Sequence, residues 1–139
     1  MQNKALTVSL AAALALAIAA GCAPPKNNTP VADIPKITKL SEVMEAQATT
    51  ADPQFSKRDQ EAFTAEEFAA LGETGAKIEA TSTHLKDFSK GPEWDALALR
   101  LNGTAVALSK AATDKDAAGA RKALTEMKAT CKECHSKLR

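Results

Sequence analysis

The sequence is poor in aromatic residues and in the groups that enzymes commonly use. Aromatic side chains make up 4% of its 139 residues, with one tryptophan and no tyrosine, so tyrosine radical or acid–base chemistry is excluded. Two histidines are present, and neither a Ser/His/Asp set nor a phosphate-binding glycine loop accompanies them. We therefore expect no enzymatic activity.

The chain also lacks an excess of either charge. Eighteen Lys and Arg stand against seventeen Asp and Glu, and removal of residues 1–21 would take away Lys4 and no acid. The remaining part would then be formally neutral. Because nucleic-acid binding depends on a basic surplus that neutralises phosphates, we expect no nucleic-acid partner.

One long apolar run is present, at the N-terminus. Residues 5–20 are almost wholly apolar, but a run of about 16 residues is short for a membrane span. With Lys4 before the run and small residues after it, residues 1–21 are predicted to be a secretory signal peptide. Ala19–Cys22 resembles the bacterial lipobox, which predicts that Cys22 is lipidated; an ordinary signal peptide with an incidental cysteine is the alternative.

The residues after Cys22 predict a tether. Residues 22–33 are rich in Pro and Asn, which disfavour a packed element and favour an extended linker. The mature protein is therefore expected to be periplasmic and anchored to a membrane by its lipid. Ala23, in place of Asp, slightly favours the outer membrane under the enteric sorting rule.

Residues 34–139 are predicted to form an all-α domain. No segment alternates with period two, and Ala, Leu, Lys and Glu dominate. A first helix is expected from about Asp33 to Ala48, with an interruption at Asp52-Pro53. A second begins at Thr64, which forms a capping box with Glu67.

Two further helices complete the predicted domain. The third is expected over residues 92–112, and the fourth from a cap at Thr113 to the C-terminus. Apolar residues recur at steps of three and four in each segment, and the connections are short. We therefore predict an antiparallel four-helix up-and-down bundle.

The strongest chemical signal lies near the C-terminus, at Cys131-Lys132-Glu133-Cys134-His135. This spacing is the attachment signature of c-type haem. On a helix, Cys131 and Cys134 share a face, so their sulfurs can bond one haem while His135 brings an imidazole to the iron. We predict one covalent haem c in the bundle core, where its large apolar ring supplies buried surface that the few aromatic side chains do not provide.

Other interpretations of the motif are weaker. A redox dithiol usually lies at a helix N-terminus, where the dipole lowers a thiol pKa, whereas this motif lies in the last turns. A zinc site would need a further ligand, and only His84 is available. A lipid-anchored bundle with a simple thiol pair is the remaining alternative.

With this C-terminal motif and four predicted helices, the chain resembles the class II c-type cytochromes, which include cytochrome c′ and its methionine-ligated low-spin relatives. The resemblance covers residues 34–139; Leu138 stands where an aromatic residue is common. It implies a sixth iron position governed by the first helix. It also allows a homodimer and implies redox proteins as partners.

Met44 is predicted to be the sixth ligand, because it lies on the inward seam of the first helix and a His/Met pair suits electron transfer. Filling of the core is the alternative role for Met44. If Leu40 covers the iron instead, the protein would be a five-coordinate, gas-binding cytochrome. His84 is a third candidate ligand, although a flanking histidine is usually solvated. Arg139 is a candidate contact for a haem propionate.

Overall fold

The computed structural model describes residues 27–138. The predicted signal peptide (residues 1–21), the lipidation site Cys22 and the propionate candidate Arg139 lie outside the described residues. Within residues 27–138, no helix is both long enough and apolar enough to cross a membrane.

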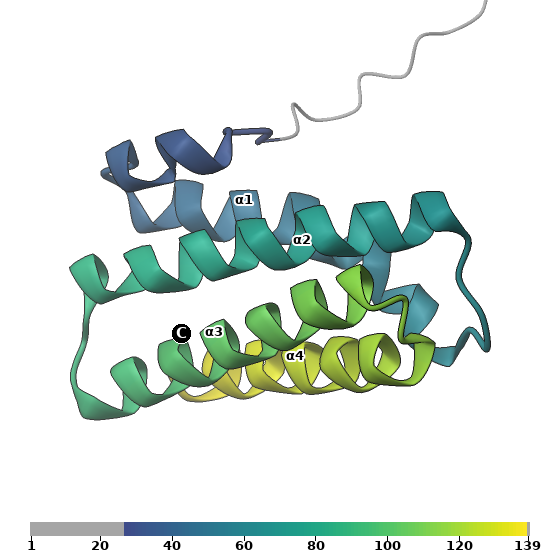
Figure 1. Ribbon diagram of the computed structural model, residues 1–139. Helices are drawn as coiled ribbons and strands as arrows, with labels where there is room; N and C mark the ends of the chain where they lie inside the picture. The colour runs from purple at the N-terminus through teal and green to yellow at the C-terminus, as the bar shows by residue number, and fades with distance from the viewer. Residues whose placement is uncertain (1–26, 139) are drawn as a thin grey trace, which may run out of the picture.

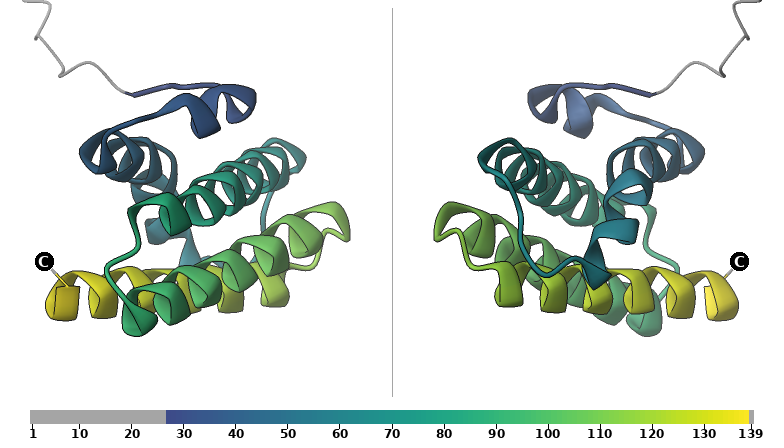
Figure 2. Two further views of the ribbon diagram at one scale, coloured as in Figure 1. Left: turned by 90° about the vertical axis from the view of Figure 1, so that its left-hand side faces the viewer. Right: turned by 90° about the vertical axis from the view of Figure 1, so that its right-hand side faces the viewer.

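The described chain consists of helices only, in agreement with the predicted fold class. In order they are η1 (Val31–Lys36), α1 (Leu40–Ala51), η2 (Asp52–Asp59), α2 (Ala65–His84), η3 (Leu85–Phe88), α3 (Pro92–Thr113) and α4 (Ala117–Leu138). The four α-helices pack antiparallel in two layers, with α1 and α2 in one and α3 and α4 in the other (Figures 1 and 2).

The start of α2 matches its prediction. The Thr64 hydroxyl accepts from the Glu67 backbone N–H at 3.2 Å, and the Glu67 carboxylate accepts from the Thr64 N–H at 2.9 Å. Phe63 and Phe68 close this end as a hydrophobic staple, with ring centroids 5.4 Å apart. The capping box and staple therefore fix where α2 begins.

The predicted start of the first helix is wrong. Val31–Lys36 forms the short 3₁₀ helix η1, Ile37 is extended, and α1 begins only at Leu40. Ile37 and Thr38 are β-branched and weak helix formers. The Ile37 carbonyl is also 2.7 Å from His84 Nε2, a long-range contact that holds it outside a helix.

The predicted cap of the last helix is also wrong. Thr113 is the final residue of α3, and its hydroxyl donates back to the Ser109 carbonyl. Asp116 caps α4 instead, because its carboxylate accepts from the Gly119 N–H at 3.0 Å. Lys115, with φ of 55°, makes the tight turn between the two helices.

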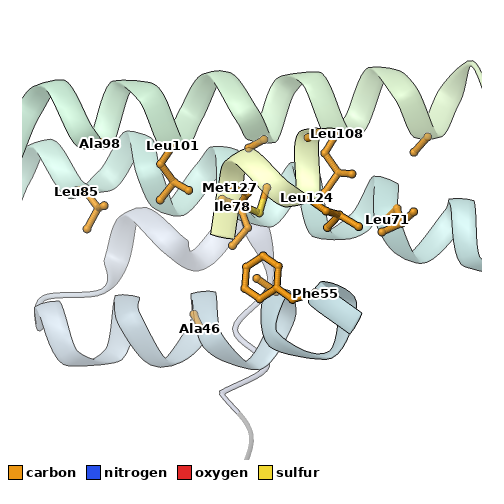
Figure 3. Packing of buried hydrophobic residues seen from close by; sticks show 14 of the residues in the cluster. Ala46, Phe55, Leu71, Ile78, Leu85, Ala98, Leu101, Leu108, Leu124 and Met127 are labelled. Atoms are coloured by element: carbon orange, nitrogen blue, oxygen red, sulfur yellow. The ribbon is translucent and has the colours of Figure 1, made fainter. Parts of the chain in front are cut away.

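The core runs along the inner faces of all four α-helices (Figure 3). α2 and α3 approach closely at Gly75, where an added Cβ would lie 2.9 Å from the Ala105 carbonyl oxygen. Phe55, from η2, folds back into the core as expected and is 8% exposed. α1 packs on α2 and η2, which leaves room between α1 and α4.

Candidate haem site

The predicted attachment motif occupies the last two turns of α4. Cys131 and Cys134 are both free thiols, half-buried, on the helix face that continues the buried seam of Leu124 and Met127. His135 is exposed at the end of the same face. The helix therefore presents two sulfurs and one imidazole in a single direction.

These groups line a cavity of about 670 Å³ between α4 and α1. Its wall contains Cys131, Cys134 and His135 from α4 and Met44 from α1. This volume lies within the range of about 300–1,000 Å³ that is typical of cofactor sites. The structure thus brings Met44 close to the three residues of the motif, which lie some ninety positions later in the sequence.

A smaller hollow of about 330 Å³ adjoins the cavity towards the C-terminal end of α4. Met44, Cys134 and His135 line both spaces, whereas Leu40 lines only the smaller one. Met44 is half-buried and packs against the core. Of the two candidates on α1, Met44 is therefore the one that lies on both spaces beside His135.

The pKa values of the two thiols are shifted in the opposite direction from those of a redox dithiol. Burial raises the pKa of the Cys131 thiol to about 11, and the nearby Cys134 and Asp52 add to the effect. Burial likewise raises the pKa of Cys134. A redox-active pair needs a lowered thiol pKa, because the thiolate is the attacking form. The environment instead keeps two neutral sulfurs against an apolar space.

A charged network fixes the motif from its outer side. Glu133, between the two cysteines, pairs with Arg100 of α3, and Lys137 bridges Glu133 at 3.0 Å and Glu93 at 2.9 Å. Hydrogen bonds from Arg100 and then Lys137 lower the pKa of the Glu133 carboxyl. By anchoring the outward residue of the motif to α3, the network keeps Cys131 and Cys134 turned to the cavity.

His84 is neither solvated, as the sequence suggested for it, nor part of the site. Its side chain is buried, with Nε2 at 2.7 Å from the Ile37 carbonyl oxygen and Nδ1 at 2.9 Å from the Asp87 carboxylate. Both ring nitrogens are thus engaged with protein groups. His84 does not line the cavity, so its role is to tie α2 to the segment before α1.

Two residues that line the cavity, Trp94 and Arg58, were not predicted as site residues. Trp94, expected only as core, lines both spaces and donates from Nε1 to the Leu85 carbonyl at 2.9 Å. Arg58 of η2 also lines the cavity. The signal for Arg58 was indirect: Asp52-Pro53 predicted an interruption of the first helix, but not where the charged residues after it would lie.

The residues present fit a covalently attached haem. Two free, half-buried thiols three positions apart face a space of cofactor size whose wall is largely apolar, and one imidazole and one thioether lie beside them. In the part of the chain that the structure describes, no three His, Cys, Asp or Glu residues cluster in a way that could hold a bare metal ion.

Comparison with known proteins gives one match. A family model described as Cytochrome C′ matches residues 36–139, about three-quarters of the chain. Comparisons with curated proteins and with solved structures find no significant match.

Proposed function

The chain belongs to the cytochrome c′ family, and on that premise we propose that it is an electron-transfer protein whose iron is ligated by His135 and Met44. Proteins of this family bind one covalent haem c, are periplasmic and are not enzymes. When bound, the haem supplies a one-electron Fe(III)/Fe(II) couple. The residues of this chain determine how the haem is held and what reaches the iron.

In this proposal, Cys131 and Cys134 would hold the haem through thioether bonds, and His135 would supply an imidazole nitrogen to the iron. Covalent attachment retains the cofactor in an exported protein. The raised pKa values of both thiols support the assignment, because neutral sulfurs are compatible with the apolar wall. The ion pairs of Glu133 limit rotation of this part of α4 and so orient His135.

Whether the protein transfers electrons or binds a gas depends, in this proposal, on whether Met44 ligates the iron. The supporting observation is that Met44 lines both the cavity and the smaller hollow together with His135, from the opposite wall. A thioether opposite an imidazole raises the reduction potential and leaves no open site for an added ligand. Both properties suit a carrier that exchanges electrons with partner proteins.

The absorption spectrum of the oxidised and reduced protein tests the ligation. We expect a low-spin ferric form with a methionine-to-iron charge-transfer band, and Met44→Ala should convert it to a high-spin form. Met127→Leu is the matched control, because Met127 is fully buried but does not line the cavity. An unchanged spectrum in Met44→Ala would remove Met44 from the account.

A five-coordinate, gas-binding protein is the second candidate. Leu40 is half-buried, one turn before Met44, and shares the smaller hollow with His135, so it can shield an iron that has no sixth ligand. This candidate predicts that the untreated ferric protein is already high-spin. It also predicts that the reduced protein binds CO without displacing an internal ligand.

We further propose that lipidation of Cys22 tethers the domain to the outer membrane. The support is the sequence pattern around Cys22. The predicted tether over residues 22–33 extends too far, because Val31–Asp33 belong to η1 and the Asn27 side-chain amide donates to the Glu42 carbonyl at 3.0 Å; a tether before Asn27 would still let the domain reach redox partners. Cys22→Ser should move the protein from the membrane fraction to the soluble periplasmic fraction and abolish incorporation of labelled palmitate. Arg139 is a predicted propionate contact that competes with cations at the η2 end of the cavity.

A further inference from the structure

The two ends of the haem cavity differ in charge. At the η2 end the wall includes Arg58, Lys128 and Lys132, and Asp52 is the one acidic residue that lines the larger space in the described chain. At the other end, the smaller hollow is lined by one Lys or Arg residue, Lys90. An anionic group in the cavity is therefore favoured at the η2 end.

Arg58 and Lys128 both line the cavity on the side of η2, where Phe55 also lies. Lys128 Nζ lies 5.4 Å from the ring centroid, and Phe55 itself lines the cavity. Arg58 follows Phe55 by three residues in the 3₁₀ helix η2, where side chains at that spacing eclipse. The two cations thus come from separate elements, η2 and α4, to the same edge.

Little in the described chain neutralises these two cations. The recorded partner of Arg58 is its neighbour Asp59, at 3.5 Å, and the Asp59 side chain is 81% exposed. No ion pair is recorded for Lys128 among the described residues. Both side chains therefore add positive potential on the η2 side of the cavity, which favours an anion there.

The opposite end offers no comparable pair. Lys90 Nζ lies 5.2 Å from the Trp94 ring centroid, much as Lys128 lies from Phe55, but no second Lys or Arg lines the smaller hollow with Lys90 in the described chain. Lys137, nearby on α4, is held between Glu93 and Glu133. Helix α1 contributes no Lys or Arg at all, since its sequence is LSEVMEAQATTA.

We propose that Arg58 and Lys128 bind the haem propionates, so that the carboxylate edge of the ring faces η2 while its other side is bonded along Cys131 and Cys134. An arginine can hold a carboxylate through two parallel N–H donors, and a lysine acts as a point charge. Both residues are positioning groups that set the ring's orientation. They also favour the reduced iron, because positive charge stabilises the less positive oxidation state. The inference rests on haem binding and is independent of whether Met44 ligates the iron.

Spectroelectrochemical titration of the holoprotein tests the proposal. Arg58→Gln and Lys128→Gln should each raise the ratio of oxidised to reduced haem, at a fixed applied potential, by about threefold to tenfold; tenfold corresponds to 59 mV for one electron. Arg58→Lys, which keeps the charge, should restore most of the potential. Asp52→Asn should shift the ratio in the opposite direction.

Lys122→Gln is the matched control, because Lys122 is also on α4 but pairs with Glu126 and does not line the cavity. Wild-type potentials in both Arg58→Gln and Lys128→Gln would overturn the proposal. So would a shift in Lys90→Gln or Arg139→Gln with none in Arg58→Gln. If Arg58→Gln does not fold, Lys128→Gln and Asp52→Asn carry the test. The absorption spectrum separates the two proposals, since loss of Met44 ligation changes the spin state whereas loss of a propionate contact changes the potential at constant spin state.

Discussion

The close approach of α2 and α3 at Gly75 predicts opposite effects for two glycine-to-alanine substitutions. In Gly75→Ala the new Cβ would clash with Ser109 Oγ and would lie 2.8 Å from Ser109 N and 2.9 Å from the Ala105 carbonyl oxygen. A side chain can rotate away, but these two backbone atoms cannot move unless the helices separate. Overpacking of this kind costs about 1–3 kcal/mol, and the gain in helix propensity offsets only about 1 kcal/mol.

Gly103→Ala is the matched comparison. Gly103 lies inside α3 on its exposed side, and an added Cβ would meet nothing within 4 Å. This substitution should stabilise the holoprotein by about 0.5–1 kcal/mol, through helix propensity alone. Gly75→Ala should instead lower the free energy of unfolding by up to about 2 kcal/mol, which is the overpacking cost less the gain in helix propensity.

Guanidinium denaturation followed by circular dichroism measures both effects, provided that the slope of the transition is unchanged. The two midpoints should move in opposite directions from the wild type. Equal stabilisation by both substitutions would refute the inferred contact between the α2 and α3 backbones. It would also refute the geometry that follows from it, in which these helices touch at Gly75 and diverge towards the haem cavity (Figure 1).

Two further predictions concern groups outside the cavity. His84→Phe should destabilise the protein by about 1–3 kcal/mol, because the buried Ile37 carbonyl loses its donor; its visible spectrum should match the wild type, and an altered spectrum would make His84 a ligand after all. The hydrogen bond from the Thr64 N–H, followed by that from Gln60, lowers the pKa of Glu67. A lowered folded-state pKa means that the carboxylate stabilises the fold above the ordinary pKa of Glu, and that this contribution is lost as the pH falls through the lowered value. The stability difference between wild type and Glu67→Gln should therefore be present at pH 7 and fade below about pH 4, as measured by thermal unfolding; a difference that does not vary with pH would contradict the capping box.

Features that depend on local spacing could be predicted from the sequence. Steps of three and four placed Leu124, Met127 and Cys131 on one face of the last helix, and the structure confirms that face. The pair Thr64 and Glu67 identified the start of α2 for the same reason, since both partners lie within one turn.

Features that depend on partners far away in the sequence could not be predicted from it. The Ile37 carbonyl leaves the helical pattern to meet His84, forty-seven positions away, so the start of α1 was predicted too early. Arg58 reaches the cavity rim only because η2 folds back over Phe55 and meets α4. Neither contact leaves a periodic signal in the residues around it.

The position of the two thiols on an inner wall has a consequence for how the haem reaches them. Cys131 and Cys134 lie on α4, whereas the opposite wall of the cavity, α1, lies some ninety residues earlier in the chain. The contacts between α2 and α3 and between α3 and α4 join neighbouring helices, and such local pairings form quickly. Because α1 packs mainly on α2 and η2, movement of α1 would widen access to both sulfurs while the α3–α4 contacts stay in place. We therefore expect the haem to reach Cys131 and Cys134 from the side of α1, the α-helix with the fewest contacts to the rest of the bundle.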